Sequence, residues 1–278
     1  MDTCAAPVWS HLCDWVTLAD AVDVPDAPRT RPALRGPVGS WNAVCCYSGR
    51  DVEVAVPDLA AMPLAGREPV RRFAWHRAQR HRAGLEFLVS TGRHHGYESL
   101  QEARLLRVVD FAAGAGEVLS QPLRLRFTTV DGPREHIPDF LVCGHSGWWL
   151  VDVRPRQCVR DGELAAFAAA AQVAAVSGWG YVVVGGWKPH VWSTVDAMSA
   201  HRRPLSDVLD IGAGMLAAVS ERPRSFGELT GATVLPAVAR AVLLHLLWHR
   251  RVGIDLTRPL GEHTLVRAAA RGGVEGVR

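Results

Sequence analysis

Two short apolar runs in the middle of the chain place the strongest constraint on its fold. They cover residues 136–143 and 148–153 and are joined by Gly-His-Ser-Gly at 144–147, which is typical of a hairpin of buried strands. Each run contains one acid, Asp139 in the first and Asp152 in the second. A buried carboxylate is costly unless it binds a metal ion or pairs with a cation. The hairpin therefore predicts two carboxylates held close together.

The surrounding pattern predicts an α/β fold. Apolar residues recur at helical spacing from Ser99 to the Ala/Gly stretch at 112–116, and an alanine-rich helix is expected over 161–176. Alternating apolar and basic residues over 123–127 indicate a half-buried strand, and 181–184 reads as a buried one. Helix, antiparallel strands, helix and strand together predict a mixed sheet flanked by helices.

Three segments are expected along the chain. Residues 1–65 form an N-terminal extension with a β-hairpin, residues 66–203 form the α/β domain, and residues 204–278 form a third segment. This last segment contains helical patterns over 205–219, 225–228 and 236–250, followed by short strands over 252–256 and 264–266. Three helices and a terminal hairpin predict a winged helix-turn-helix domain.

Composition excludes several classes of protein. No stretch of about 18 apolar residues occurs and no signal peptide opens the chain, so a cytoplasmic protein without membrane contact is expected. The six cysteines lack the paired spacing of zinc ribbons or redox motifs, which indicates reduced thiols. A net charge of +3 permits nucleic acid as a partner without requiring it.

Basic residues concentrate between residues 67 and 95 and recur on the strand at 123–127. They are either phosphate contacts for DNA or a solvated basic face. The candidates for DNA contact are Arg71, Arg72, Arg77, Arg80, Arg93, His94, His95, Arg124 and Arg126.

The acids suggest metal-assisted chemistry. Asp152 and Arg154 are two residues apart on one strand and should share a face. With Glu102 from the preceding helix and Asp139, three carboxylates would surround one or two divalent ions, a donor set that suits Mg²⁺, with Mn²⁺ as an alternative. Such ions activate water and neutralise charge in phosphodiester hydrolysis.

The same residues resemble a known family. Pro138-Asp139 followed by Asp152-Val153-Arg154 resembles the Pro-Asp…(Asp/Glu)-x-Lys signature of restriction-endonuclease-like nucleases. More specifically, the chain resembles TnsA, the endonuclease subunit of Tn7-like heteromeric transposases. Four stretches carry this resemblance: Ser99-Leu100-Gln101-Glu102, Ser120-Gln121-Pro122, Pro138-Asp139-Phe140-Leu141-Val142 and Val151-Asp152-Val153-Arg154-Pro155.

The resemblance implies a restriction-endonuclease-like core that cuts double-stranded DNA at transposon ends, on the strand that the partner integrase-type transposase leaves intact. Glu102, Asp139 and Asp152 would hold Mg²⁺, and Arg154 would stand where the family has its active-site lysine. Such a protein would act at the nucleoid. The C-terminal domain would dock onto the transposition ATPase, which agrees with the mostly apolar pattern of residues 236–250.

Arg154 is the departure from the family pattern. Lysine can lose its proton and help to activate water, whereas arginine stays protonated. Lys188 is the only lysine in the chain, and it follows the next strand, so it is poorly placed to substitute.

Other interpretations of these residues remain open. Ser99 and Glu102 have the spacing of a helix-capping box, in which case Glu98 is the reserve metal ligand. Asp152 and Arg154 could form a plain ion pair, and Asp139 could accept hydrogen bonds in a turn. At the level of function, the alternatives are a stand-alone restriction or repair nuclease and a catalytically inactive transposition assembly subunit.

Overall fold

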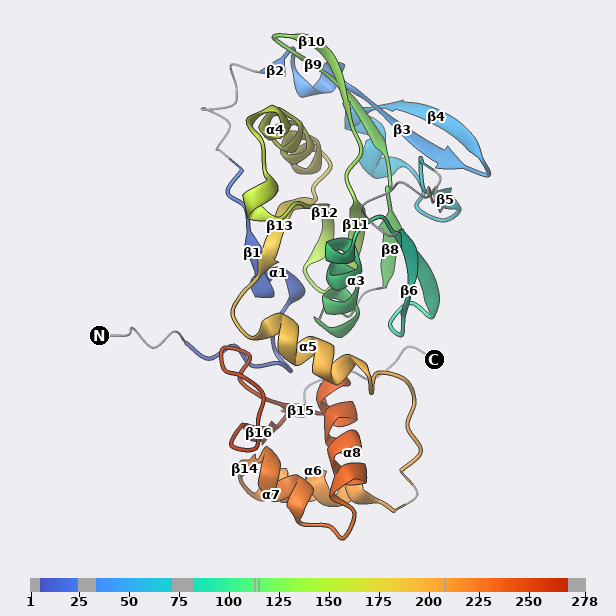
Figure 1. The fold of residues 1–278 in the computed structure, drawn as a ribbon. Coiled ribbons are helices and arrows are strands. Elements are labelled where there is room, and N and C mark those ends of the chain that lie inside the picture. Colours follow the sequence, from blue (N-terminus) through green and yellow to red (C-terminus); the bar gives the residue numbers. More distant parts are fainter. Residues whose placement is uncertain are drawn as a thin grey trace, which may run out of the picture. The chain divides into compact units, whose positions relative to one another are not determined.

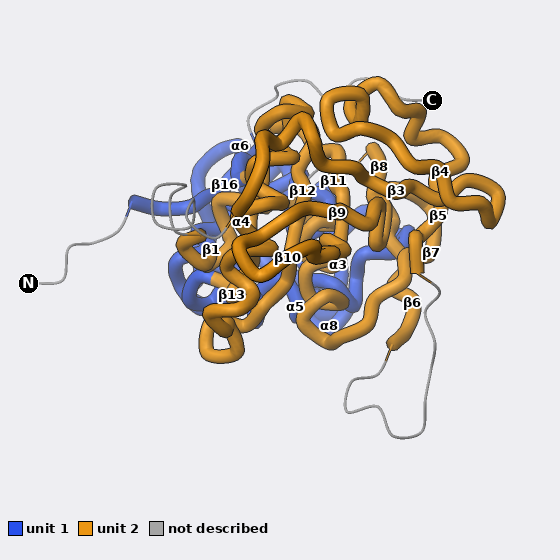
Figure 2. The backbone as a smooth tube through the Cα atoms, turned by 90° about the horizontal axis from the view of Figure 1, so that it is seen from above, with its two compact units in different colours: residues 1–13, 188–278 blue, residues 14–187 orange. Residues whose placement is uncertain are grey.

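The structure, a computed structural model, describes residues 6–24, 34–71, 83–112, 114, 116–207 and 209–269. These residues form two compact units, coloured separately in Figure 2. We call residues 14–187 the core unit. The C-terminal unit combines the segment that ends at Cys13 with the chain from Lys188 onward.

A five-stranded mixed sheet is the centre of the core unit. Only β12 and β13 run parallel, and every other neighbouring pair is antiparallel. The strand order is β1 (Ala19–Ala21), β13 (Gly180–Trp187), β12 (Gly147–Val153), β11 (Phe140–Gly144) and β8 (Glu117–Ser120).

Helices flank this sheet, as Figure 1 shows. The main ones are α3 (Leu100–Ala112) and α4 (Asp161–Val176), and a short α1 (Trp15–Leu18) precedes β1. The expected α/β class with a mixed sheet between helices is thus confirmed. Helix α4 starts where its sequence predicts, because the Glu163 carboxylate accepts the Arg160 amide at 2.9 Å, and it stops at Gly178, whose φ of +71° suits glycine.

A second sheet lies in the same unit. Strands β10 (Gly132–His136), β9 (Arg124–Thr129), β3 (Asn42–Tyr47) and β4 (Arg50–Ala55) are neighbours in that order. At its edges β2 (Leu34–Arg35) pairs with β9, and β5 (Arg67–Glu68) pairs with β3. A separate hairpin joins β6 (Gly84–Leu88) to β7 (Arg93–Tyr97).

The pairing of β3 with β9 corrects the expected division of the chain. The predicted hairpin near residues 43–56 is present as β3 and β4, but β3 also hydrogen-bonds to β9 through Asn42, Ala43 and Val44. The residues before 66 therefore do not stand apart as an extension, because they complete a sheet with residues 124–136.

One hydrophobic core joins both sheets to α4. Leu141 and Leu150 of the first sheet and Leu125 of the second pack in a single buried cluster with Ala170 and Val173 of α4. The alternation predicted for residues 123–127 is also seen, since Leu123, Leu125 and Phe127 are buried while Arg126 is exposed. The α4 helix thus covers the sheet face from which the site residues project.

The strand expected over residues 136–143 is divided in two. His136 ends β10 in the second sheet, residues 137–139 cross between the sheets, and β11 begins at Phe140 in the first sheet. Pro138 has no N–H to give to a ladder, which accounts for the break. Asp139 therefore lies in the crossing rather than within the strand.

The C-terminal unit combines helices with a small sheet. Strands β14 (Arg224–Ser225), β16 (Leu265–Ala268) and β15 (Val252–Gly253) lie in that order. Its helices are α5 (Val191–Ser199), α6 (Ile211–Glu221), α7 (Phe226–Gly231) and α8 (Pro236–Trp248). The predicted capping box is present, with the Glu228 amide bonded to Ser225 Oγ and the Ser225 amide to the Glu228 carboxylate.

Two boundaries in this unit differ from expectation. Helix α5 was not predicted, and it moves the start of the unit from residue 204 to Lys188. The N-terminal segment also joins it, because Ser10 donates its amide to Ile254 O at 2.9 Å and Leu256 donates to Val8 O at 2.8 Å. Short 3-10 turns at Val38–Ser40, Val56–Ala61 and Arg156–Cys158 complete the described elements. Among these elements, none is a helix of the length and apolar character needed to cross a membrane.

Replacing Leu150 with alanine should destabilise the core unit. Leu150 is fully buried in the cluster that joins the sheets to α4. Its loss should lower the free energy of unfolding by about 2–5 kcal/mol, the range for a leucine truncated in a packed core. Leu85→Ala is the control because Leu85 is 65% exposed, and it should change stability by less than about 0.5 kcal/mol. Equal effects in urea titrations would contradict this account of the core.

Candidate active site

A cavity of about 780 Å³ lies at the end of strand β12 in the core unit. Its lining comes from the start of α3, the crossing before β11, the end of β12 and the first turns of α4. All four catalytic candidates from the sequence line this cavity: Glu102, Asp139, Asp152 and Arg154. Two further acids, Glu98 and Glu163, line it as well.

Asp139 is fixed to β12 by its backbone and its side chain. Its amide donates to Val151 O at 3.0 Å, and its Oδ2 accepts the Val153 amide at 2.7 Å. Burial, followed by the neighbouring Asp152 and Glu102 carboxylates, raises the pKa of Asp139 well above its usual value. Asp139 does accept a hydrogen bond, but from Val153 of β12 and not within a turn as the alternative expected, and this bond holds the carboxylate near other acids.

Asp152 is only 3% exposed and has two polar partners. The Tyr181 hydroxyl donates to Asp152 Oδ2 at 2.6 Å, and His136 Nε2 lies 3.0 Å from the carboxylate. Burial acts to lower the pKa of His136, but the Asp152 carboxylate outweighs it, so the pKa is raised overall. Asp152 is therefore held from two sides by groups other than Arg154.

Glu102 forms only part of the capping box that its spacing allows, because its carboxylate accepts the Glu98 amide in place of the Ser99 amide. Its amide donates to Ser99 Oγ at 3.2 Å, and its Oε2 accepts the Glu98 amide at 2.8 Å. The side chain is buried, and burial raises its pKa. Glu102 can therefore cap the helix and also line the cavity, because only its Oε2 accepts the backbone amide. Glu98, the reserve candidate, forms an ion pair with Arg71.

Arg154 pairs with α4. Its guanidinium contacts Glu163 through Nε at 3.2 Å and a terminal nitrogen at 2.9 Å. The plain ion pair considered for Asp152 and Arg154 is not the arrangement found, since Asp152 bonds to Tyr181 and His136. Lys188 is not among the described residues that line the cavity.

The donor chemistry of the cavity suits a hard divalent cation. Glu102, Asp139 and Asp152 offer carboxylate oxygens, the ligands that Mg²⁺ prefers. The pKa of Asp139 is raised first by burial and then by the neighbouring Asp152 and Glu102 carboxylates, whose negative charge a cation would offset. Within the described part of the chain, no three His, Cys, Asp or Glu side chains are gathered closely enough to form a ready-made ligand set. Each of these carboxylates is instead held by its own protein donor.

The basic candidates for DNA contact are mostly neutralised by acids. Arg71 pairs with Glu98, Arg93 with Glu117, Arg124 with Asp51 and Glu135, and Arg126 with Glu53 and Glu135. His95 is buried and bonds to Thr91, while His94 is exposed and its ring contacts Phe87. Arg72, Arg77 and Arg80 lie outside the described residues.

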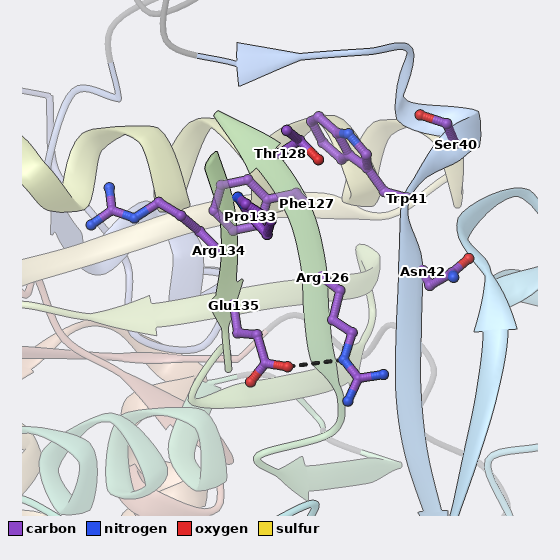
Figure 3. A pocket seen from close by; sticks show the side chains of 9 residues that line it. All are labelled: Ser40, Trp41, Asn42, Arg126, Phe127, Thr128, Pro133, Arg134 and Glu135. Atoms are coloured by element: carbon purple, nitrogen blue, oxygen red, sulfur yellow. Dashed lines mark hydrogen bonds and ion pairs between the residues drawn. The ribbon is translucent and has the colours of Figure 1, made fainter. Parts of the chain in front are cut away.

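Figure 3 shows one of these arginines in its surroundings. Arg126 and Glu135 project from β9 and β10 beside a pocket of about 340 Å³, with Nε to Oε1 at 2.9 Å. A guanidinium already paired on both sides has less to gain from a phosphate. This sheet is therefore a mixed-charge surface rather than the purely basic face suggested by residues 123–127.

Three residues of the site were not assigned roles from the sequence. They are Tyr181 and His136, which bond to Asp152, and Glu163, which pairs with Arg154. Tyr181 carried a usable signal, since it is the one polar side chain in the apolar run at 181–184. Gln121 stands beside the site as well, with a φ of +45° and its amide bonded to Asp139 O at 2.7 Å.

No family model matches the sequence, and no curated protein matches it.

Asp139→Asn should stabilise the protein at alkaline pH. A carboxyl whose pKa is raised by folding binds more protons in the native state, so its contribution favours folding at low pH and is lost as the pH rises through the raised value. Asparagine keeps an acceptor for the Val153 amide without the charge. The melting temperature should exceed that of the wild type by about 2–4 °C at about pH 8, the effect of roughly 1 kcal/mol in a chain of this size.

The gain should shrink as the pH falls toward about 5, where the native carboxyl is protonated more often. Asp131→Asn is the control, because Asp131 is exposed in the β9–β10 turn. A stabilisation by Asp139→Asn that does not depend on pH would contradict the electrostatic explanation.

Proposed function

We propose that this chain is a divalent-metal-dependent DNA endonuclease, acting as the nuclease subunit of a heteromeric transposase at transposon ends. One observation carries the proposal: Glu102, Asp139, Asp152 and Arg154 line a single cavity. These are the residues for which the resemblance to TnsA-like endonucleases implies a catalytic role. Separate elements, α3, the crossing before β11 and β12, contribute them.

The topology supports a restriction-endonuclease-like core. A mixed sheet has its antiparallel β11–β12 hairpin preceded by α3, followed by α4, and then by the parallel strand β13. The acids lie at the crossing before β11 and at the end of β12, where the hairpin strands bring them together. This is the order of helix, antiparallel strands, helix and strand that the sequence pattern predicts.

The C-terminal unit supports a docking role more than a DNA-reading one. Of the four described helices in this unit, α6, α7 and α8 together with the small three-stranded sheet provide the parts of a winged helix. Helix α8 buries most of its side chains, so it offers few polar groups to base edges. A groove of about 540 Å³ is lined mainly by apolar residues of α6, α7 and the loop before α8, and one of them, Val234, is 96% exposed. We assign this unit to binding the transposition ATPase.

Each residue of the cavity has a place in the proposed reaction. Glu102, Asp139 and Asp152 would hold Mg²⁺, or Mn²⁺ in its place, which when bound supplies Lewis-acid activation of water and neutralises charge on the scissile phosphate. Arg154 provides a fixed cation for a phosphate oxygen, since Glu163 holds its guanidinium by two contacts. Arginine remains protonated, so Arg154 orients and stabilises charge but does not take a proton from water.

Asp139→Ala should abolish cleavage. With end-labelled transposon-end DNA, Mg²⁺ and the partner transposase, the wild type should cut the strand that the transposase leaves intact. The cleavage rate of the variant should fall by more than about a hundredfold. Loss of a group that only hydrogen-bonds to a metal ligand costs up to about a hundredfold, so a larger loss indicates a direct ligand. Cleavage without the partner, at short sites unrelated to transposon ends, would favour a stand-alone nuclease instead.

A second candidate is an assembly subunit without catalytic activity. The pairing of Arg154 with Glu163 favours it, because the position of the family's lysine holds an arginine that is already engaged by a carboxylate. If the wild type and Asp139→Ala are equally inert while both bind the partner transposase, this candidate replaces the nuclease.

Substitutions at Arg154 separate the two candidates further. In an active nuclease, Arg154→Ala should slow cleavage by about a hundredfold, which is typical for removing one donor to developing charge. Arg154→Lys keeps the charge but loses the two-pronged contact with Glu163, and it should stay within about tenfold of the wild type. Rates that do not change in either variant would exclude Arg154 from the chemistry.

A further inference from the structure

The carboxylate of Asp152 is held by two side chains from different sheets. Tyr181 belongs to β13 in the first sheet, and His136 is the last residue of β10 in the second. The Tyr181 hydroxyl donates to Asp152 Oδ2 at 2.6 Å, and His136 Nε2 is 3.0 Å from the carboxylate. Such short contacts from two directions fix both the position and the rotation of the group.

Both partners are themselves fixed by packing. In the parallel β12–β13 pair Tyr181 is opposite Leu150, two residues before Asp152, so Tyr181 and Asp152 project from the same face. The His136 ring stands edge-on to Phe167 of α4, with ring centroids 6.1 Å apart. The orientation of Asp152 is therefore set by β13, β10 and α4 together.

This arrangement is not what a structural ion pair would need. Arg154 projects from the same strand as Asp152, but its guanidinium contacts Glu163. The group beside Asp152 that can carry a positive charge is His136, whose Nε2 lies 3.0 Å from the carboxylate. Asp152 has oriented hydrogen-bond partners while it lines a cavity with other acids. Carboxylates that bind metals are commonly held in this way by outer partners.

We propose that Tyr181 and His136 are positioning residues that hold the Asp152 carboxylate in the orientation required to bind a divalent cation in the cavity. The inference rests on the proposed metal-dependent function and adds two residues to it. Neither residue is assigned a step in the chemistry. Their contribution is to keep Asp152 in one orientation before the cation arrives, so that less ordering is needed on binding.

The test is a titration of the full-length chain with Mn²⁺, in which electron paramagnetic resonance measures the concentration of the free ion. Tyr181→Phe removes only the hydroxyl and should weaken Mn²⁺ binding about tenfold, as outer partners of metal ligands typically do. Tyr47→Phe is the matched control. It also removes a bonded hydroxyl, the one that Arg67 donates to at 3.2 Å, but Tyr47 is in β3 and does not line the cavity. Its affinity should stay within about twofold of the wild type.

Substitutions at His136 test the inference independently. They keep it testable even if the Tyr181→Phe variant does not fold. His136→Gln keeps an N–H donor, so it should bind Mn²⁺ more tightly than His136→Ala. A purely structural role would lower the melting temperature without this donor-dependent difference in affinity. Equal affinities for His136→Gln and His136→Ala would overturn the role of His136.

Failure of the inference can be distinguished from failure of the proposed function. If the wild type binds Mn²⁺, Asp139→Ala does not, and Tyr181→Phe equals the wild type, the positioning role of Tyr181 is wrong and the metal site stands. If the wild type binds no more Mn²⁺ than Asp139→Ala, the metal-dependent function fails and the inference fails with it.

Discussion

The contact between the Asp139 carboxylate and the Val153 amide is the constraint on which the site depends. Residues 137–139 leave one sheet and enter the other, and Pro138 cannot donate to a ladder there. Asp139 compensates in part, since its Oδ2 accepts the Val153 amide at 2.7 Å while its own amide reaches Val151 O. The side chain thereby joins the crossing to β12. The same contact fixes Asp139 near Asp152. The hydrogen bond that satisfies the Val153 amide therefore also brings the two acids together.

The charge in the cavity is unevenly balanced. Five carboxylates line it, from Glu98, Glu102, Asp139, Asp152 and Glu163. The two arginines with described pairs to them take up the outer acids, because Arg71 engages Glu98 and Arg154 engages Glu163. The inner group of Glu102, Asp139 and Asp152 is left with hydrogen-bond partners, and burial and mutual repulsion raise the pKa of Asp139. In the proposed function, a divalent cation would offset the negative charge of this inner group.

The sequence predicted those parts of the fold that local rules determine. The β11–β12 hairpin followed from two short apolar runs around a glycine-bounded turn, and α4 from a helical pattern that glycine ends. Pairing across a long sequence separation was not predictable in this way, because nothing near Ala43 indicates that its strand neighbours Leu125. Sequence periodicity also could not show that residues 136–143 serve two sheets, because the two strands that they join, β10 and β11, are paired with partners elsewhere in the chain.

The site shows the same limit. Asp139 and Asp152 were identified because an acid in an apolar strand is costly wherever it lies. The partners of those acids depend on three-dimensional neighbours. Spacing placed Arg154 beside Asp152, yet its guanidinium extends to Glu163, and Tyr181 reaches Asp152 from another strand. The prediction of a basic face over residues 123–127 was incomplete for a similar reason. The acids that pair with Arg124 and Arg126 come from other strands, β4 and β10.

Arginine at position 154 is weaker evidence against catalysis than it first suggests. Every basic residue of the chain except Lys188 and the histidines is an arginine, so arginine at any one position that carries positive charge is expected from composition alone. The informative feature is the surroundings. A guanidinium with two contacts to Glu163 is held in one orientation, whereas an ammonium group there would form a less directional contact. Glu163 and Arg154 therefore match each other as a pair, and this pairing fixes the orientation of the guanidinium.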